Sequence, residues 1–170
     1  MWDTWIVNKV EEAVGRFSVS CKFTSASDQF VLAFTSVYGP NLRRGNRFLW
    51  EELYGLNSWW SVPWCVGGDF NVVRFPSERL GSNSFIATVQ EFSNFILEQG
   101  LIDLPLQGGA FTWSNSQEVA SKARLDKFLF STDWEDKFPT VSQRRMFRLC
   151  SDHFPIVLES GSFQRGRYVA

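Results

Sequence analysis

Residues 64–71, which read WCVGGDFN, constrain the fold of this chain more than any other stretch. An apolar run of strand-forming residues leads into two glycines, after which an aspartate and an asparagine follow. On an extended backbone, residues two apart project to the same face, so we expect Asp69 and Asn71 to point together and Phe70 to point away. Such a carboxylate can accept a proton or bind a hard cation. Ordinary turn chemistry is the alternative, because Asp and Asn often cap the ends of strands.

The composition is that of one domain with a sizeable core, which we place at residues 1–160, with a loose tail at residues 161–170. The chain has 170 residues, of which 44% are hydrophobic. Its 17 Phe and 8 Trp suit a layered sheet whose core is filled by large rings. The formal net charge of -1 gives no general attraction to nucleic acid. Any site for a polyanion must therefore be a local patch.

The three cysteines, Cys21, Cys65 and Cys150, are widely spaced and form no Cys-x-x-Cys arrangement. We therefore expect reduced, buried thiols, without a disulfide partner or a structural zinc site. The first residues contain neither a basic start nor a long apolar run, so we expect no signal peptide and no membrane span. These features predict an intracellular protein.

The hydrophobic patterns predict helices mixed with strands. We expect a hairpin from residues 16–23 and 29–38, a helix over residues 46–60 that ends before Pro63, and a helix over residues 85–99 that ends at Gly100. Short strands are expected at residues 110–113, 124–130, 141–147 and 155–158, with a helical turn at residues 133–138. Since strands and helices do not alternate strictly, the pattern favours an α+β layered sandwich with helices outside the sheets.

The single histidine, His153, lies in a polar loop that leads into the last apolar strand. A lone histidine is usually a surface or structural residue. Asp126, however, shares a strand face with Phe128 and Phe130, which is unusual for a carboxylate without a partner. A buried carboxylate that bonds an imidazole would fix its tautomer, which makes Asp126 and His153 a candidate pair.

Two arginine clusters lie beside these loops, the first at Arg43, Arg44 and Arg47 and the second at residues 144–148. A solvated surface explains such clusters, but their guanidinium groups could also bind phosphates. Between them, residues 108–115 read GGAFTWSN. Core packing explains Phe111, whereas Trp113 could lean on a deoxyribose or a base.

The motifs VYGPN (37–41), GDFN (68–71), FTWSN (111–115), RLD (124–126) and SDHFPI (151–156) occur in this order along nearly the whole chain. In this combination the sequence resembles the endonuclease/exonuclease/phosphatase superfamily. Within it, the sequence is most similar to the apurinic-type endonuclease domain of plant LINE (non-LTR) retrotransposons.

The resemblance implies a DNase I-like, four-layered α/β sandwich with two mixed β-sheets, and a site that nicks DNA to supply a primer end for reverse transcription in the nucleus. Mg²⁺ or Mn²⁺ would be the cofactor, since hard cations suit phosphate and carboxylate oxygens. The implied catalytic residues are Tyr38, Asp69, Asn71, Asp126 and His153. The implied substrate-binding residues are Asn41, Arg43, Arg44 and Trp113, and Asp152 would lie near the metal.

One departure from the superfamily pattern bears on activity. Members usually begin with further strands and a Gln-Glu-Thr-like segment, whose glutamate is the principal metal ligand. Met1 to Asp3 match the point just after that region, and Glu11 and Glu12 lie in a segment unlike the motif. We therefore expect an N-terminally truncated domain with weak or lost catalysis. The alternatives are a DNA-binding module that uses Arg43, Arg44 and Trp113 without cleavage, or a phosphatase of small phosphoesters.

Overall fold

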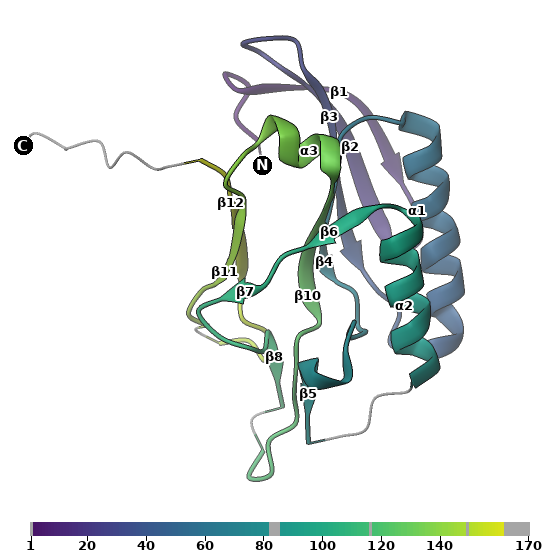
Figure 1. Cartoon of the computed structure of the whole chain (residues 1–170), viewed down its shortest axis with the longest axis vertical. Helices are drawn as coiled ribbons and strands as arrows, with labels where there is room; N and C mark the ends of the chain where they lie inside the picture. The colour runs from purple at the N-terminus through teal and green to yellow at the C-terminus, as the bar shows by residue number, and fades with distance from the viewer. Residues whose placement is uncertain (1, 82–85, 116, 149, 162–170) are drawn as a thin grey trace, which may run out of the picture.

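A six-stranded sheet forms the centre of the computed structural model, which describes residues 2–81, 86–115, 117–148 and 150–161 (Figure 1). β3 and β4 are parallel, because α1 crosses between them, and every other neighbouring pair is antiparallel. Across the sheet the strands are β1 (Val7–Val14), β2 (Ser18–Ser25), β3 (Val31–Tyr38), β4 (Trp64–Asp69), β10 (Asp126–Ser131) and β6 (Leu101–Asp103).

Two smaller sheets complete the strands. β12 (Ile156–Glu159), β11 (Ser142–Arg145) and β7 (Leu106–Gln107) form a second mixed sheet. β5 (Arg79–Leu80), β9 (Lys122–Ala123) and β8 (Trp113–Ser114) form a third, antiparallel one. In Figure 1 the second sheet lies on the opposite side of β4 and β10 from α1 and α2, with the short helix α3 (Thr132–Lys137) at its upper end.

The helices α1 (Asn46–Trp60) and α2 (Ile86–Glu98) cover one face of the large sheet. Their apolar stripes bury Leu49, Leu53, Phe92 and Ile96 completely. Trp50 stacks on Phe92 with ring centroids 5.1 Å apart, so aromatic rings fill much of this core. Both helices begin at the same end of the molecule, where short 3₁₀ turns at Arg43–Gly45 and Pro76–Glu78 also lie.

The predicted α+β sandwich with two mixed sheets is confirmed, and the hairpin and both long helices lie where the sequence predicts them. In the described part of the chain, α1 and α2 cover the outer face of the larger sheet only. Gly100, with φ of 60°, follows α2 as predicted. Phe85, which was expected to begin the α2 stripe, and most of the expected tail lie outside the described residues.

Three expectations need correction. β1 was not predicted, because its register shifts between Lys9 and Glu11 and breaks the alternation of its apolar residues. The strand expected at residues 110–113 is only the two-residue β8, which follows a loop that holds Gly108 at a φ of 81°. Among the thiols Cys65 is buried, whereas Cys150 is exposed.

None of the described helices has the length and apolar character that a membrane crossing requires.

Candidate active site

Strand register places Tyr38, Asp69 and Asp126 in one row across three neighbouring strands. Tyr38 pairs with Asp69 between the parallel strands β3 and β4. Asp126 pairs with Asp69 between the antiparallel strands β4 and β10. The end of β4 therefore brings together three residues that span 88 positions of the sequence, from 38 to 126. The predicted site residues meet because of the sheet, not because of their spacing in the chain.

His153 lies over this row and is bonded by Asp126. The imidazole Nδ1 lies 2.8 Å from Asp126 Oδ2. Since an ionised carboxylate only accepts hydrogen bonds, Nδ1 carries the proton and donates it. The other ring nitrogen, Nε2, lies 3.8 Å from Asp69 Oδ2, which is beyond hydrogen-bond distance. The His153 side chain is 30% exposed, so the space between Nε2 and Asp69 is open to a reacting group.

Asp69 occupies a partly buried position that favours its protonated form. Burial raises the pKa of Asp69 above its ordinary value, and the negative charge of Asp126 raises it further. The backbone N–H of Asn71 donates to Asp69 Oδ1 at 2.8 Å and opposes this shift. The side chain is 11% exposed. A carboxyl group in this position can accept and release a proton closer to neutral pH than an ordinary aspartate can.

Asn71 lies beside Asp69, as expected, but strand alternation is not the reason. β4 ends at Asp69, and Asn71 has a φ of 54° in the left-handed region. Its backbone N–H bonds the Asp69 carboxylate, and its Nδ2 donates to the carbonyl oxygen of Gly39 at 2.8 Å. A Cβ at Gly39 would lie 2.3 Å from the Phe70 carbonyl oxygen. Asn71 thus joins Asp69 to the loop that follows Tyr38.

Thr112 holds the Asp126 and His153 segments together, a role that sequence reasoning missed. Its side chain is fully buried, and its Oγ1 accepts the backbone N–H groups of Leu125 and Asp126 at 3.0 Å each. Its carbonyl oxygen accepts the N–H of Phe154 at 2.7 Å. The FTWSN motif contains this threonine, but only the fold shows that it bridges two loops.

Comparisons with known proteins agree on the architecture. No family model matches the sequence, and no curated protein matches it either. The structure is similar to the endonuclease domain of TRAS1, a telomere-specific non-LTR retrotransposon, with a TM-score of 0.70 and 16% identity over 89% of this chain and 66% of that chain. The chain has the fold of the endonuclease/exonuclease/phosphatase superfamily.

Further solved structures share this endonuclease/exonuclease/phosphatase fold. A Bacteroides thetaiotaomicron protein described as a member of that family gives a TM-score of 0.60 at 16% identity, over 91% of this chain and 65% of that one. A humanized D. rerio TDP2 gives 0.58 at 15% identity, over 89% of this chain and 66% of that one. The chain thus spans about two thirds of the length of these structures. The superfamily resemblance predicted from the motifs is confirmed at the level of the fold.

Trp113 and Asp152, which were predicted to contact the substrate and to lie near the metal, bond each other within this fold. The indole Nε1 of Trp113 donates to Asp152 Oδ2 at 2.9 Å. This bond is the main reason why the pKa of Asp152 lies below its ordinary value. Trp113 also forms a β-bridge with His153. The pair therefore braces the histidine loop, and the predicted roles toward substrate and metal stay predictions.

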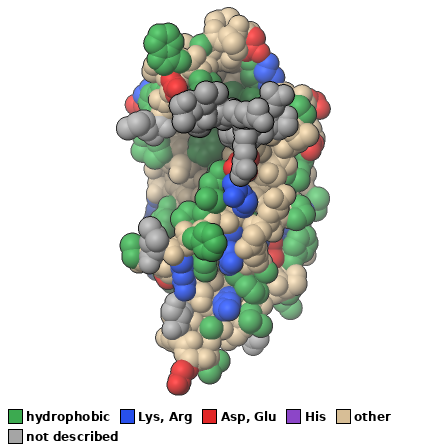
Figure 2. All heavy atoms as spheres, turned by 90° about the vertical axis from the view of Figure 1, so that its left-hand side faces the viewer, with side chains coloured by type: hydrophobic (Ala, Val, Ile, Leu, Met, Phe, Trp, Pro, Cys, Tyr) green, Lys and Arg blue, Asp and Glu red, His purple; other side chains and the backbone are tan. Residues whose placement is uncertain are grey.

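The arginine cluster near the histidine also braces that loop. Arg145 donates to the Phe111 carbonyl oxygen at 2.9 Å, and its guanidinium carbon lies 4.1 Å from the Phe154 ring centre. Arg148 lies 4.6 Å from the same ring and donates to the Asp152 carbonyl oxygen at 3.2 Å. Figure 2 shows basic side chains gathered on this side of the molecule.

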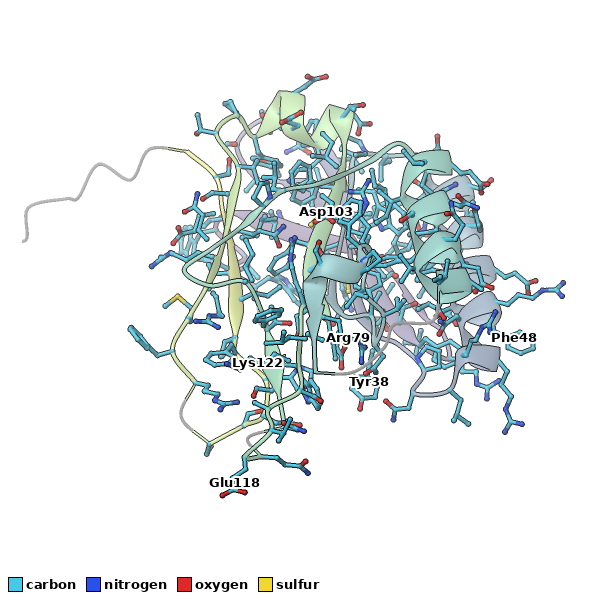
Figure 3. The ribbon with its side chains drawn as sticks, turned by 60° about the horizontal axis from the view of Figure 1, so that its bottom comes forward. Tyr38, Phe48, Arg79, Asp103, Glu118 and Lys122 are labelled. Carbon is cyan, nitrogen blue, oxygen red and sulfur yellow. The ribbon has the colours of Figure 1, made fainter. Side chains whose placement is uncertain are left out.

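The first cluster, by contrast, is exposed beside the site. Arg43 and Arg44 are exposed in the 3₁₀ turn that follows Asn41, which is also exposed. Tyr38 is 66% exposed and lies at the same end of the molecule (Figure 3). These residues remain accessible to a substrate, as the resemblance implies.

The described residues do not fit a divalent cation by themselves. Among them, no group of three or more His, Cys, Asp or Glu side chains is placed to hold a metal ion. Asp126 is bonded to His153, and Asp152 is bonded to Trp113. Asp69 is left as a single carboxylate, which supplies too few oxygen donors to hold a divalent cation.

Proposed function

We propose that this chain is a nucleic-acid phosphodiesterase domain of the LINE endonuclease type, which acts on DNA and cleaves weakly on its own. One observation carries the proposal: Asp126 bonds His153 at Nδ1, and Nε2 then faces Asp69 across 3.8 Å. A partly buried orienting carboxylate, an imidazole and a second carboxyl group of raised pKa are groups suited to proton transfer.

In the proposed reaction, Asp69 accepts a proton from the attacking water, which forms a bond to phosphorus as the bond to the leaving oxygen breaks. In this step the imidazole of His153 carries a proton on both nitrogens: Nδ1 donates to Asp126, and Nε2 donates to a non-bridging phosphate oxygen and stabilises its growing negative charge. The departing oxygen takes up a proton from solvent. Tyr38 and Asn41, both exposed beside this row, would bind the same phosphate. Asn71 positions the Asp69 carboxyl group through its backbone N–H.

Mg²⁺ or Mn²⁺ would supply charge neutralisation at the phosphate when bound. The described residues offer too few oxygen donors for tight binding. We therefore propose that the chain binds either cation weakly, which is our reason for expecting slow cleavage.

Nicking of supercoiled plasmid DNA in Mg²⁺ or Mn²⁺ tests this function. Asp69→Asn and His153→Gln should abolish whatever nicking the chain shows, because each removes a group that moves or donates a proton. Asp136→Asn, at an exposed aspartate of α3, is the matched control and should nick like the parent chain. Nicking that survives both site substitutions would contradict the proposal.

A second candidate is binding of DNA without cleavage, which the lack of a metal-binding cluster among the described residues favours. Duplex binding that weakens as salt rises, with no nicking at any metal concentration, would support it. Release of phosphate from small esters, with no effect on DNA, would instead identify a phosphatase.

A further inference from the structure

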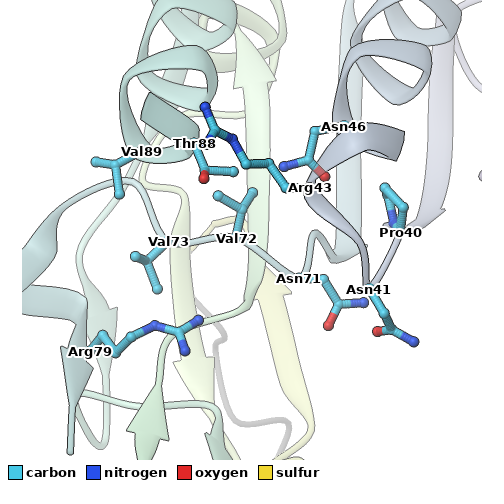
Figure 4. A pocket seen from close by; sticks show the side chains of 10 residues that line it. All are labelled: Pro40, Asn41, Arg43, Asn46, Asn71, Val72, Val73, Arg79, Thr88 and Val89. Carbon is cyan, nitrogen blue, oxygen red and sulfur yellow. The ribbon is translucent and has the colours of Figure 1, made fainter. Parts of the chain in front are cut away.

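A polar pocket of about 220 Å³ lies directly beside the candidate active site. It is enclosed by the loops that follow β3 and β4, by β5, and by the first turns of α1 and α2 (Figure 4). Asn41 and Asn71, which belong to the candidate site, also line this pocket. The pocket and the site are therefore continuous.

The charges around the pocket favour an anion. Arg43 reaches the pocket from the 3₁₀ turn before α1 and Arg79 from β5, on different sides of the cavity (Figure 4). The described residues that line it include no Asp or Glu. α1 and α2 both begin at this pocket, and neither has an acidic residue in its first turn. The positive ends of two helix dipoles thus add to the two guanidinium groups.

Thr88 gives an independent indication of a ligand. Its side chain lines the pocket in the first turn of α2, and the residue is 9% exposed. Its Oγ1 is buried and has no hydrogen-bond partner among the described residues. A buried hydroxyl group without a partner is costly, so the polar atoms of a bound group would stabilise it. Asn46, which is 3% exposed, adds a second buried polar side chain to the wall.

We propose that this pocket is a second phosphate subsite, which binds the backbone phosphate next to the scissile one in a nucleic-acid strand. The proposal rests on the proposed function, because Asn71 connects the two subsites. The apolar wall formed by Val72, Val73 and Val89 suits the sugar between the phosphates. Such a subsite selects polynucleotides over small phosphoesters, which carry no neighbouring phosphate.

Arg79 is the residue on which we expect binding to depend most. Partial burial lowers the pKa of Arg79 from its ordinary value, because the guanidinium group loses solvation. A phosphate within reach would add a charge-assisted hydrogen bond to this guanidinium group. Arg43 is exposed, so its contribution should be smaller.

The test measures binding of a short single-stranded DNA oligonucleotide to the whole chain in EDTA, so that no cleavage intervenes. Arg79→Gln should weaken binding about tenfold, as expected for a charged hydrogen bond. It should also reduce the slope of log affinity against log salt by about 0.7, which is the value for one phosphate contact on a single strand. Thr88→Val should weaken binding about threefold.

Lys137→Gln is the matched control, because Lys137 lies in α3, pairs with Asp28 and does not line the pocket. Arg79→Lys retains the charge and should recover part of the affinity. Thermal unfolding of each variant separates lost binding from lost folding. If Arg79→Gln folds and binds as Lys137→Gln does, the subsite proposal is overturned.

The two proposals fail in different ways. Loss of binding in Arg79→Gln, together with no nicking by the parent chain in Mg²⁺ or Mn²⁺, would support the subsite and overturn the hydrolase. Nicking that depends on His153, with binding unaffected by Arg79→Gln, would support the hydrolase and overturn the subsite. Competition by inorganic phosphate that disappears in Arg79→Gln would show that the pocket accepts the phosphate group itself.

Discussion

β10 carries charged side chains on both of its faces, and the two faces have different functions. Asp126 points toward His153 in a site that is partly open to solvent. Lys127, the next residue, points to the opposite face and is fully buried. One step along a strand thus separates a charge that remains accessible for chemistry from a charge that is sealed inside the protein.

The buried face holds a network of five charged residues. Lys127 Nζ lies 2.5 Å from Glu78 Oε1 and 3.6 Å from Asp103 Oδ2. Arg124 bonds the same two carboxylates, at 3.2 Å and 3.0 Å, and Arg74 lies 3.4 Å from Asp103. Burial lowers the pKa of Lys127, whereas the two carboxylates oppose that change. Figure 3 shows Asp103 in the interior of the molecule.

The comparison shows what separates a structural charge cluster from a chemical one. In the network each carboxylate bonds more than one cation, so neither carboxylate is left for a ligand. In the site, Asp69 and the Nε2 atom of His153 are held 3.8 Å apart and do not satisfy each other. The network should therefore control folding, and the site should control activity.

The largest effect on stability is expected from Lys127→Ala. Removal of this ammonium group leaves Glu78 and Asp103 short of a buried partner, which should lower the free energy of unfolding by about 3–5 kcal/mol. Urea denaturation measures the change. Lys122→Ala, in β9 and only partly buried, is the control. Equal stability of the two variants would contradict the claim that the buried face of β10 controls folding.

Asp126→Ala should have the opposite effect: it should reduce nicking strongly and change stability little. Nicking is expected to fall about 10²- to 10³-fold, because His153 loses its orienting partner. The free energy of unfolding should change by less than about 1 kcal/mol, since the ion pair is partly exposed. Nitrogen NMR of the single histidine gives a readout that does not require activity. The parent chain should show a protonated Nδ1, and the variant a mixture of tautomers; an unchanged spectrum would contradict the assignment.

Thr112→Val should lower stability by an amount between those expected for Lys127→Ala and Asp126→Ala. The substitution leaves the backbone N–H groups of Leu125 and Asp126 without their buried acceptor, which should cost about 1–3 kcal/mol of stability. Thr112→Ser keeps the hydroxyl group and should retain most of the stability of the parent chain. Denaturation of both variants measures the difference, and a valine variant as stable as the serine variant would show that Thr112 does not brace β10.

Asp69→Asn should have a small effect on stability, and that effect depends on pH. The folded-state pKa of Asp69 lies above its unfolded value, so its contribution to stability is fully present below the unfolded pKa and is lost as pH rises through the folded pKa. At pH 7 the variant with the neutral asparagine should therefore be more stable than the parent chain. This difference should shrink as pH falls toward the ordinary carboxyl pKa of about 4. A pH-independent difference in denaturation midpoints would rule out the titration of Asp69 as its cause.

The sequence predicted the parts of the molecule that local patterns encode. The stripes of α1 and α2 have helical period, and Asp126 stood out because its strand neighbours on the same face are phenylalanines. The pairing of Asp126 with His153 was expected on these grounds and is confirmed by their 2.8 Å hydrogen bond. The superfamily motifs then predicted the fold.

The features that the sequence did not predict depend on contacts between distant segments. The charge network joins residues from position 74 to position 127, none of which belongs to a periodic pattern. Arg79 and Thr88 likewise line one pocket only because β5 and the first turn of α2 come together there. The position of Asn71 was right for the wrong reason, since a left-handed turn rather than an extended strand places it.

The alternation of Asp126 and Lys127 also limits how the gene can tolerate insertions and deletions. A shift of β10 by one residue would exchange the two faces, so that an ammonium group would replace the carboxylate beside His153 and a lone carboxylate would enter the interior. A change of length inside β10 would therefore disturb both the candidate site and the buried charge network. The connection at residues 117–121 lies outside both regions, so changes of loop length between related sequences should accumulate there.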